Sequence, residues 1–229
     1  MAKLLHFFFL VLFSNALLFS QISTSTSTSD AGQLQLTITN NSSKTITAYI
    51  WSRQETLAPP AGSGAPVSSE HQFDTVGSHL KPVLAGESRV AGTSSDAKAK
   101  LELLAAIFED GSTFGSADGV QKILHHRAAV LAALKSMLPI LQASADTDFT
   151  TDALQKQLAD ARDALAAKMS EPILAGAVKG EYIALFGNIK REAKMYPDLQ
   201  DRLHYQQALI KATQEHQEAL EQSKPPLNP

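Results

Sequence analysis

The sequence predicts an α+β protein: a small antiparallel β-sandwich followed by a three- to four-helix antiparallel bundle. Two observations carry this prediction. Polar and apolar residues alternate through residues 33–53, as in half-buried strands. After Gly115 the apolar residues recur instead at the spacing of one helix face. About 205 residues remain once a leader is removed, which is enough for one larger or two small packed domains.

The first residues predict a secretory signal peptide, assigned to residues 1–22. Lys3 precedes the apolar stretch Leu4–Phe13, and small residues follow at positions 14, 16 and 20. An uncleaved anchor is the alternative, but ten apolar residues are too short to span about 30 Å of hydrocarbon. We expect cleavage to leave a new N-terminus within residues 17–26.

The segment 23–32 is expected to be a disordered linker, because its Ser/Thr run has no apolar face to bury. The β-sandwich domain is assigned to 33–116. Its first two strands, 33–39 and 44–51, flank the turn residues 40–43 and predict a hairpin or a tight strand pair. Trp51 is expected to close one face of the core.

Residues 54–70 are predicted to be loop, with short strands at 71–73, 82–84 and 88–90. Residues 98–108 fit either a strand or a helix, and we favour a strand because Glu109–Ser112 is a typical hairpin turn before Thr113–Gly115. In that strand Leu101, Leu103, Ala105 and Ile107 would share one face. The count is then five to seven strands.

The helical domain is assigned to 117–223. Ser116 or Asp118 can cap its first helix, and Pro139 is expected to kink or end that helix near residue 138. Further helices are predicted from about 150 to 169, up to Tyr196–Pro197, and from 198 to 223. Short connections imply antiparallel packing. Residues 224–229 are expected to be a loose tail.

Composition excludes several classes of protein. The chain has no cysteine, hence no disulfide, no thiolate metal site, no thiol nucleophile and no lipid-modified N-terminal cysteine. Its 20 basic and 23 acidic residues include no basic run, so neither nucleic acid nor an anionic membrane is an expected partner. No second stretch is expected to approach a membrane span after signal cleavage.

Histidines supply the only candidate metal site. His71, Asp74 and His79 lie close in sequence and could gather around an ion, although ordinary surface histidines are the more common case. The adjacent His125 and His126 point about 100° apart on a helix and cannot easily share an ion. His204 and His216 are too far apart on one helix. We therefore expect no cofactor and no metal, and no catalytic residue is identified.

Two stretches carry a resemblance. Residues 38–49, ITNNSSKTITAY, resemble the opening strands of secreted bacterial β-sandwich modules. Residues 106–115, AIFEDGSTFG, resemble a segment of uncharacterised exported bacterial proteins with a β-sandwich module and a helical tail. The resemblance implies a fold and a compartment, and it carries over no functional residue.

The expected function is that of a secreted or periplasmic, non-enzymatic protein-interaction or structural module, which contacts another protein through the β module or the bundle. A long Gln/Glu surface on the last helix, around residues 206–217, could pair with another helix or simply face solvent. The alternatives are a metal-assisted hydrolase using the His71, Asp74 and His79 cluster, and a protease-inhibitor-like sandwich whose 54–70 loop inserts into a protease.

Overall fold

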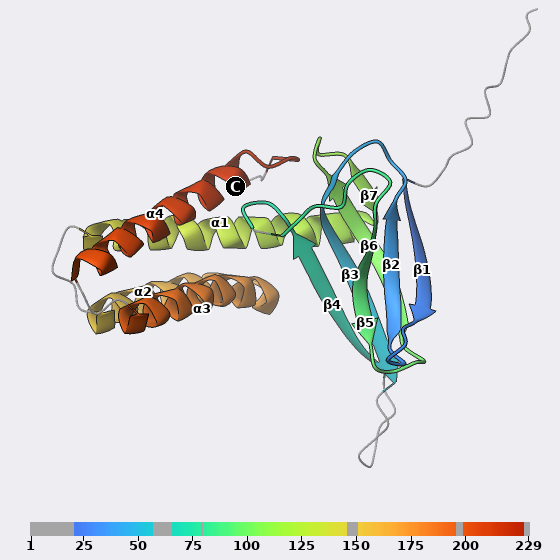
Figure 1. The fold of residues 1–229 in the computed structure, drawn as a ribbon, viewed down its shortest axis with the longest axis horizontal. Coiled ribbons are helices and arrows are strands. Elements are labelled where there is room, and N and C mark those ends of the chain that lie inside the picture. The colour runs from blue at the N-terminus through green and yellow to red at the C-terminus, as the bar shows by residue number, and fades with distance from the viewer. Residues whose placement is uncertain (1–20, 57–65, 79, 146–150, 196–198, 227–229) are drawn as a thin grey trace, which may run out of the picture.

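The computed structural model describes residues 21–56, 66–78, 80–145, 151–195 and 199–226. Seven strands come first and four helices follow, so the predicted α+β class is confirmed. Figure 1 shows the strands as two layers, with the helices extending from them as an arm. The predicted signal segment and the tip of the proposed inhibitory loop, residues 57–65, lie outside the described residues.

The sandwich consists of two antiparallel sheets. Sheet A has the order β1 (Ile22–Thr28), β2 (Leu34–Asn40), β5 (Ser88–Ser94). Sheet B has the order β4 (Pro66–Asp74), β3 (Ile46–Thr56), β6 (Lys100–Phe108), β7 (Thr113–Gly115). Leu36 and Ile38 of sheet A meet Tyr49, Trp51 and Phe108 of sheet B in one apolar core. Burial of these side chains holds the layers together.

The strand predicted at 98–108 is β6, and the hairpin that follows it is confirmed. Gly111 has φ +87°, a conformation that glycine adopts without strain, and its N–H donates to the Phe108 carbonyl at 2.9 Å. The predicted faces of the strand are wrong. The register with β3 shifts between Ile50 and Trp51, so Leu104 has no partner there and the alternation reverses. Leu101 therefore faces the sandwich core while Ala105 faces the helices.

The Ser/Thr segment 23–32, expected to be disordered, forms most of β1 instead. Pairing along β2 satisfies its backbone, and that is why a tract with almost no apolar side chain is ordered. Strands also extend into the predicted 54–70 loop, because β3 runs to Thr56 and β4 begins at Pro66.

The turn at 40–43 crosses between sheets and does not close a hairpin. β1 and β5 occupy both sides of β2, so β3 pairs in the other sheet. The buried Asn40 side chain fixes the crossing by donating to the carbonyls of Lys44 at 2.7 Å and Val83 at 3.1 Å. These bonds satisfy the buried amide of Asn40 and tie the turn to the loop that carries Val83.

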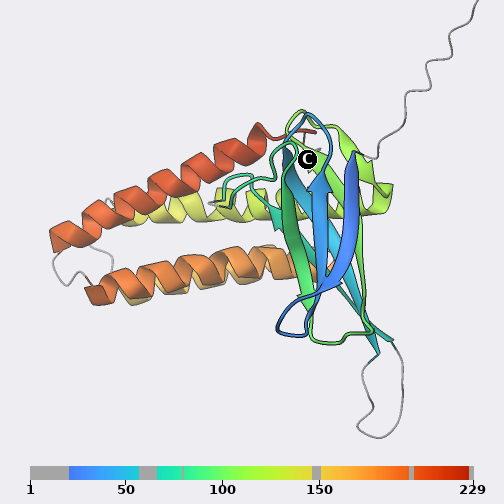
Figure 2. The same ribbon diagram turned by 45° about the vertical axis from the view of Figure 1, so that its right-hand side comes forward.

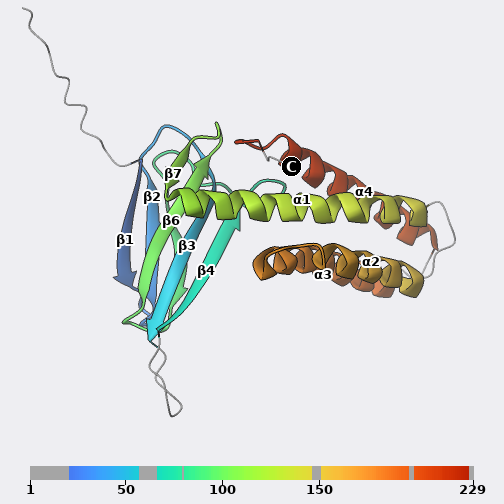
Figure 3. The same ribbon diagram turned by 180° about the vertical axis from the view of Figure 1, so that it is seen from behind.

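Four helices form the arm: α1 (Ala117–Ala145), α2 (Thr151–Ala166), α3 (Pro172–Met195) and α4 (Leu199–Glu221). Successive helices run in opposite directions, and α1 packs against each of the others (Figures 1 and 3). The Ser116 hydroxyl caps α1 by accepting from the Gly119 N–H at 3.1 Å. The antiparallel bundle predicted from the short connections is therefore confirmed.

Two predictions about α1 are wrong. Pro139 does not end the helix near residue 138, because α1 continues to Ala145. Met137 and Leu141 on either side of Pro139 pack into the bundle core, and this burial offsets the lost backbone hydrogen bond.

The second wrong prediction is that no further stretch approaches a membrane span. By length and composition, α1 is long and apolar enough to cross a membrane. Here its apolar residues pack against sheet B and the other helices, as in the central helix of a bundle.

Candidate functional site

The structure separates the two described members of the proposed metal set. His71 and Asp74 both lie on β4, but residues three apart on a strand face opposite sides of the sheet. His79 lies outside the described residues. Across the part of the chain that the structure describes, no group of three His, Asp or Glu side chains could hold a metal ion.

His71 faces the interior of the sandwich. Its ring stacks on Trp51 with 4.4 Å between ring centroids, and a ring nitrogen lies 3.1 Å from the Ser69 hydroxyl. Burial lowers the pKa of His71, and the neighbouring Arg53 lowers it further. These contacts describe a half-buried histidine packed on the only tryptophan of the chain.

Asp74 faces the opposite way, toward α1, where it forms a bidentate ion pair with Arg127. The Arg127 Nε donates to one carboxylate oxygen at 2.6 Å and a terminal nitrogen donates to the other at 3.0 Å. The Arg127 side chain is only 1% exposed and that of Asp74 16%. A guanidinium buried this completely needs an acidic partner, because a buried charge without one lowers the free energy of unfolding by roughly several kcal/mol.

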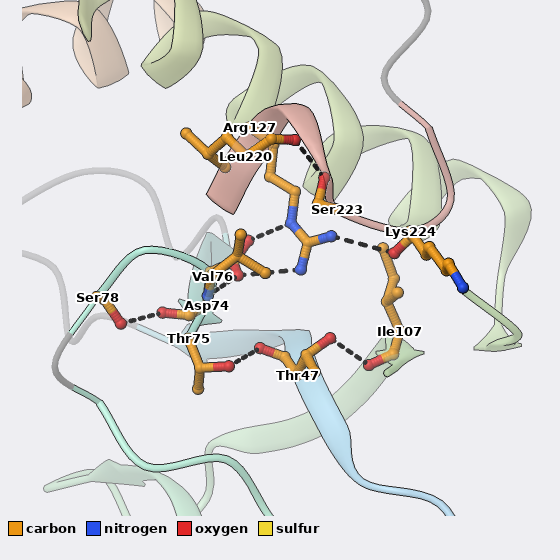
Figure 4. A network of polar contacts seen from close by, with 10 residues as sticks. All are labelled: Thr47, Asp74, Thr75, Val76, Ser78, Ile107, Arg127, Leu220, Ser223 and Lys224. Atoms are coloured by element: carbon orange, nitrogen blue, oxygen red, sulfur yellow. Dashed lines mark hydrogen bonds and ion pairs between the residues drawn. The ribbon is translucent and has the colours of Figure 1, made fainter. Parts of the chain in front are cut away.

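Further hydrogen bonds connect this ion pair to two more parts of the chain (Figure 4). Arg127 also donates to the Lys224 carbonyl at 3.3 Å, just after the end of α4. The Val76 N–H donates to Asp74 at 3.0 Å, so the loop after β4 is held as well. We call Asp74, Arg127 and Lys224 the junction cluster. Lys224 is the first residue of the segment predicted to be a loose tail, but its carbonyl accepts this hydrogen bond from Arg127.

Sequence reasoning missed Arg127. The available signal was its position: it is the one charged residue within the apolar stripe between Ile123 and Val130. Arginine at such a place is buried only with an acidic partner. The partner lies 53 positions away in the chain, on a strand, so helical spacing alone could not identify Asp74.

Two histidines lie beside the junction cluster. His126 precedes Arg127, and the ring of His216 on α4 packs against Gly77, where a Cβ atom would lie 1.8 Å from it. Burial lowers the pKa of both histidines, while the Asp74 carboxylate acts in the opposite direction on each. The neighbouring His125 on α1 is exposed. Nothing is described of the His204 side chain.

The Gln/Glu surface predicted on α4 is partly used within the bundle. The Gln206 amide donates to the Ser144 hydroxyl of α1. Gln207, Glu215 and Glu218 are exposed. Of the two alternatives for this surface, pairing with another helix or facing solvent, Gln206 follows the first, and the helix it contacts is α1 of its own chain.

A larger unpartnered surface lies on α3. Among the described residues of this helix, the outward side carries exposed apolar and small residues: Ile173, Gly176, Gly180, Ile183, Ala184, Gly187 and Met195. Ile173 is 57% exposed, Ile183 62% and Met195 58%. A Cβ atom built on any of the three glycines would meet nothing within 4 Å. We call these seven residues the α3 outer face.

The junction cluster and the α3 outer face differ in what they can do. Both Asp74 oxygens accept from one guanidinium, so neither is available as a base or a metal ligand. The cluster joins the sandwich to the arm. The α3 outer face can bury apolar area against another molecule.

The comparisons with family models, with curated proteins and with solved structures found no match for this chain.

Proposed function

We propose that the protein is exported and acts as a non-enzymatic interaction module, which binds an amphipathic helix of a partner protein on the α3 outer face. The observation that carries the proposal is the alternation on α3 of open glycines with exposed isoleucines. Glycines let a second helix approach closely, and isoleucines beside them bury area when it does.

The charges around this face favour an acidic partner. The exposed charged side chains described on α3 are all basic: Lys179, Lys190, Arg191 and Lys194. Glu181 is half-buried on the same helix, and burial raises its pKa. A helix with apolar residues on one side and acidic residues beside them would complement this surface and would bind faster at low salt.

The helices on which α3 packs also support an interaction role. α1 is anchored on sheet B at one end, and α2 and α3 pack on its remainder (Figure 2). A surface on a rigid element loses little conformational freedom on binding. Binding on a packed helix therefore fits this architecture better than catalysis, because the carboxylate of the junction cluster is already bound by the Arg127 guanidinium.

Binding is tested with matched variants of the purified protein. Synthetic helical peptides of equal hydrophobicity, one with acidic and one with basic flanks, serve as probes in fluorescence titrations. We expect the acidic peptide to bind and Ile183→Glu to weaken binding at least about tenfold. Leu84→Glu, at an exposed apolar residue of the sandwich, is the control and should change nothing. Equal binding of both peptides, or equal loss in the control, would contradict the proposal.

Export is tested separately by determining the N-terminus of the protein after expression in its native host. We expect the new N-terminus to lie at 17–21, the first part of the range 17–26. The Gln21 carbonyl accepts from the Asn41 N–H at 2.9 Å and Ile22 begins β1, so an N-terminus at 17–21 would keep this strand whole. A full-length N-terminus on a cytoplasmic protein would contradict export and leave the binding test unaffected.

A further inference from the structure

The outer edge of β1 from Thr24 to Thr28 has no partner strand among the described residues. β1 is an end strand of sheet A and pairs with β2 over seven residues in unbroken register. Its sequence after Ile22 alternates serine and threonine, and all six of these residues are exposed. The strand therefore presents a regular, uncharged edge to its surroundings.

The hydrogen-bond pattern identifies which backbone groups point outward. The Gln21 carbonyl accepts from Asn41, and the Ser29 N–H donates to Gln33 at 2.8 Å, so the odd-numbered residues bond to β2. Bonding alternates along an antiparallel ladder. Thr24, Thr26 and Thr28 consequently direct their N–H and C=O groups away from β2, and among the described residues no strand pairs with that side.

The other sheet edges in the described part of the chain carry features that discourage pairing. β7 has only three residues. β4 begins with a proline and carries Glu70 in an ion pair with Lys122 at 2.7 Å. β5 contains a register shift, and its Arg89 donates to the Pro82 carbonyl at 2.9 Å beside the edge. Short length, proline, charge and bulges are the usual protections of an edge strand. β1 has none of them.

We propose that the β1 strands of two copies of this chain pair antiparallel around a two-fold axis, so that their two sheets A form one continuous sheet. The Ser/Thr alternation is self-complementary in this arrangement. Pairing the outward groups of Thr24, Thr26 and Thr28 with those of the second copy places threonine opposite threonine and serine opposite serine. Such hydroxyl pairs stabilise adjacent strands, and no like charges meet.

A second copy fits this edge better than an unrelated strand because the match comes from the sequence of β1 itself. One strand pair buries less than the roughly 1,000 Å² that a stable interface needs. The dimer is therefore reversible and concentration-dependent. It leaves the α3 outer face open, so it is independent of the proposed function.

Sedimentation velocity of the exported, purified protein over a concentration series tests the dimer. We expect Thr26→Pro and Thr26→Lys to weaken dimerisation at least about tenfold. Proline removes an N–H that makes no bond to β2, so the fold should survive, as far-UV circular dichroism and Trp51 fluorescence would verify. Thr93→Lys on β5 is the matched control, and Ile183→Glu on α3 is a second one. Neither should change the dimer.

Cysteine cross-linking gives an independent readout, because the chain has no cysteine of its own. In the two registers centred on β1, either Ser25 or Thr26 lies opposite its own copy, at a Cα separation of about 4.5–5.5 Å that a disulfide can bridge. We expect Ser25→Cys or Thr26→Cys to cross-link, and Thr93→Cys not to. A monomer at every concentration, or cross-linking at Ile183→Cys alone, would overturn the proposal.

Discussion

The base of α1 and the outer face of α3 show opposite kinds of packing in one helical arm. At the base, a Cβ atom on Gly119 would lie 2.8 Å from the Cβ of Ala105 in sheet B. On α3, a Cβ atom on Gly176 or Gly180 would meet nothing within 4 Å. The same residue type thus marks close contact within the molecule at one place and open surface at the other.

The arm is held to the sandwich at its base and not along its outer side. Its base is fixed to the sandwich by apolar contacts of Ile123 with Ala48 and Ile107 and by the buried Asp74–Arg127 pair. Its outer helix α3 packs on other helices through residues such as Tyr182 and Leu185. The arm is consequently anchored at one end and available for contacts along its side.

The largest expected effect comes from breaking the anchor with Asp74→Ala. The substitution leaves the Arg127 guanidinium buried without its acidic partner and should lower the free energy of unfolding by about 3 kcal/mol. Urea unfolding followed by Trp51 fluorescence reports on the sandwich, and circular dichroism at helical wavelengths reports on the arm. We expect the two transitions to coincide in the original chain and to separate in the variant.

The controls for this prediction are an exposed ion pair and a double substitution. Asp160→Ala breaks an exposed Lys156–Asp160 pair and should cost no more than about 0.5 kcal/mol. Asp74→Leu combined with Arg127→Met should recover part of the loss, since no charge is then left buried. An Asp74→Ala cost as small as that of Asp160→Ala would mean that the ion pair does not anchor the arm.

A smaller effect is expected from adding one methyl group at glycines in the two regions. Gly119→Ala should lower the free energy of unfolding by about 1–2 kcal/mol, because the gain in helix propensity is outweighed by overlap with Ala105. Gly180→Ala should raise it by about 0.5–1 kcal/mol, because alanine is the better helix former and nothing opposes its methyl group. Thermal unfolding of both variants provides the measurement. Equal signs would contradict the contrast between base and outer face.

The second glycine variant also separates stability from binding. Gly180→Ala fills part of the space through which a partner helix would approach. We expect it to bind the acidic probe peptide more weakly although it is the more stable protein.

The sequence was informative wherever one local pattern decided the structure. The helical spacing beyond Gly115 predicts α1 to α4, and the turn at Glu109–Ser112 predicts β6 and β7. It was not informative where pairing overrides composition. β1 is ordered by its neighbour β2, and the partition of β2 and β3 between sheets depends on β1 and β5 occupying both sides of β2.

The candidate site could be predicted only in part. Asp74 was singled out, for metal binding, from its nearness to His71 in the sequence. Its actual partner, Arg127, is distant in the sequence and comes from another element, so no spacing rule joins them. The α3 outer face was missed because Gly176 and Gly180 suggest a weak helix, and exposure of a helix side depends on where the other helices pack.

The smallest expected effect concerns pH and again distinguishes the two regions. His126 and His216 lie near Asp74 and Arg127, and burial lowers the pKa of both histidines below the ordinary 6.5. Below about pH 6.5 the unfolded chain therefore binds more protons than the folded chain. The free energy of unfolding should fall as pH drops from 6.5 toward the folded pKa values, and His216→Gln should reduce this slope.

Glu181, on α3, acts in the opposite direction: burial raises its pKa, so the folded chain binds its proton more readily and gains stability as pH falls. Glu181→Gln should thus steepen the loss of stability on acidification, whereas His216→Gln should lessen it. If both substitutions changed the slope in the same direction, the base and the outer helix would not differ in their response to protons, and the contrast between them would be confined to packing.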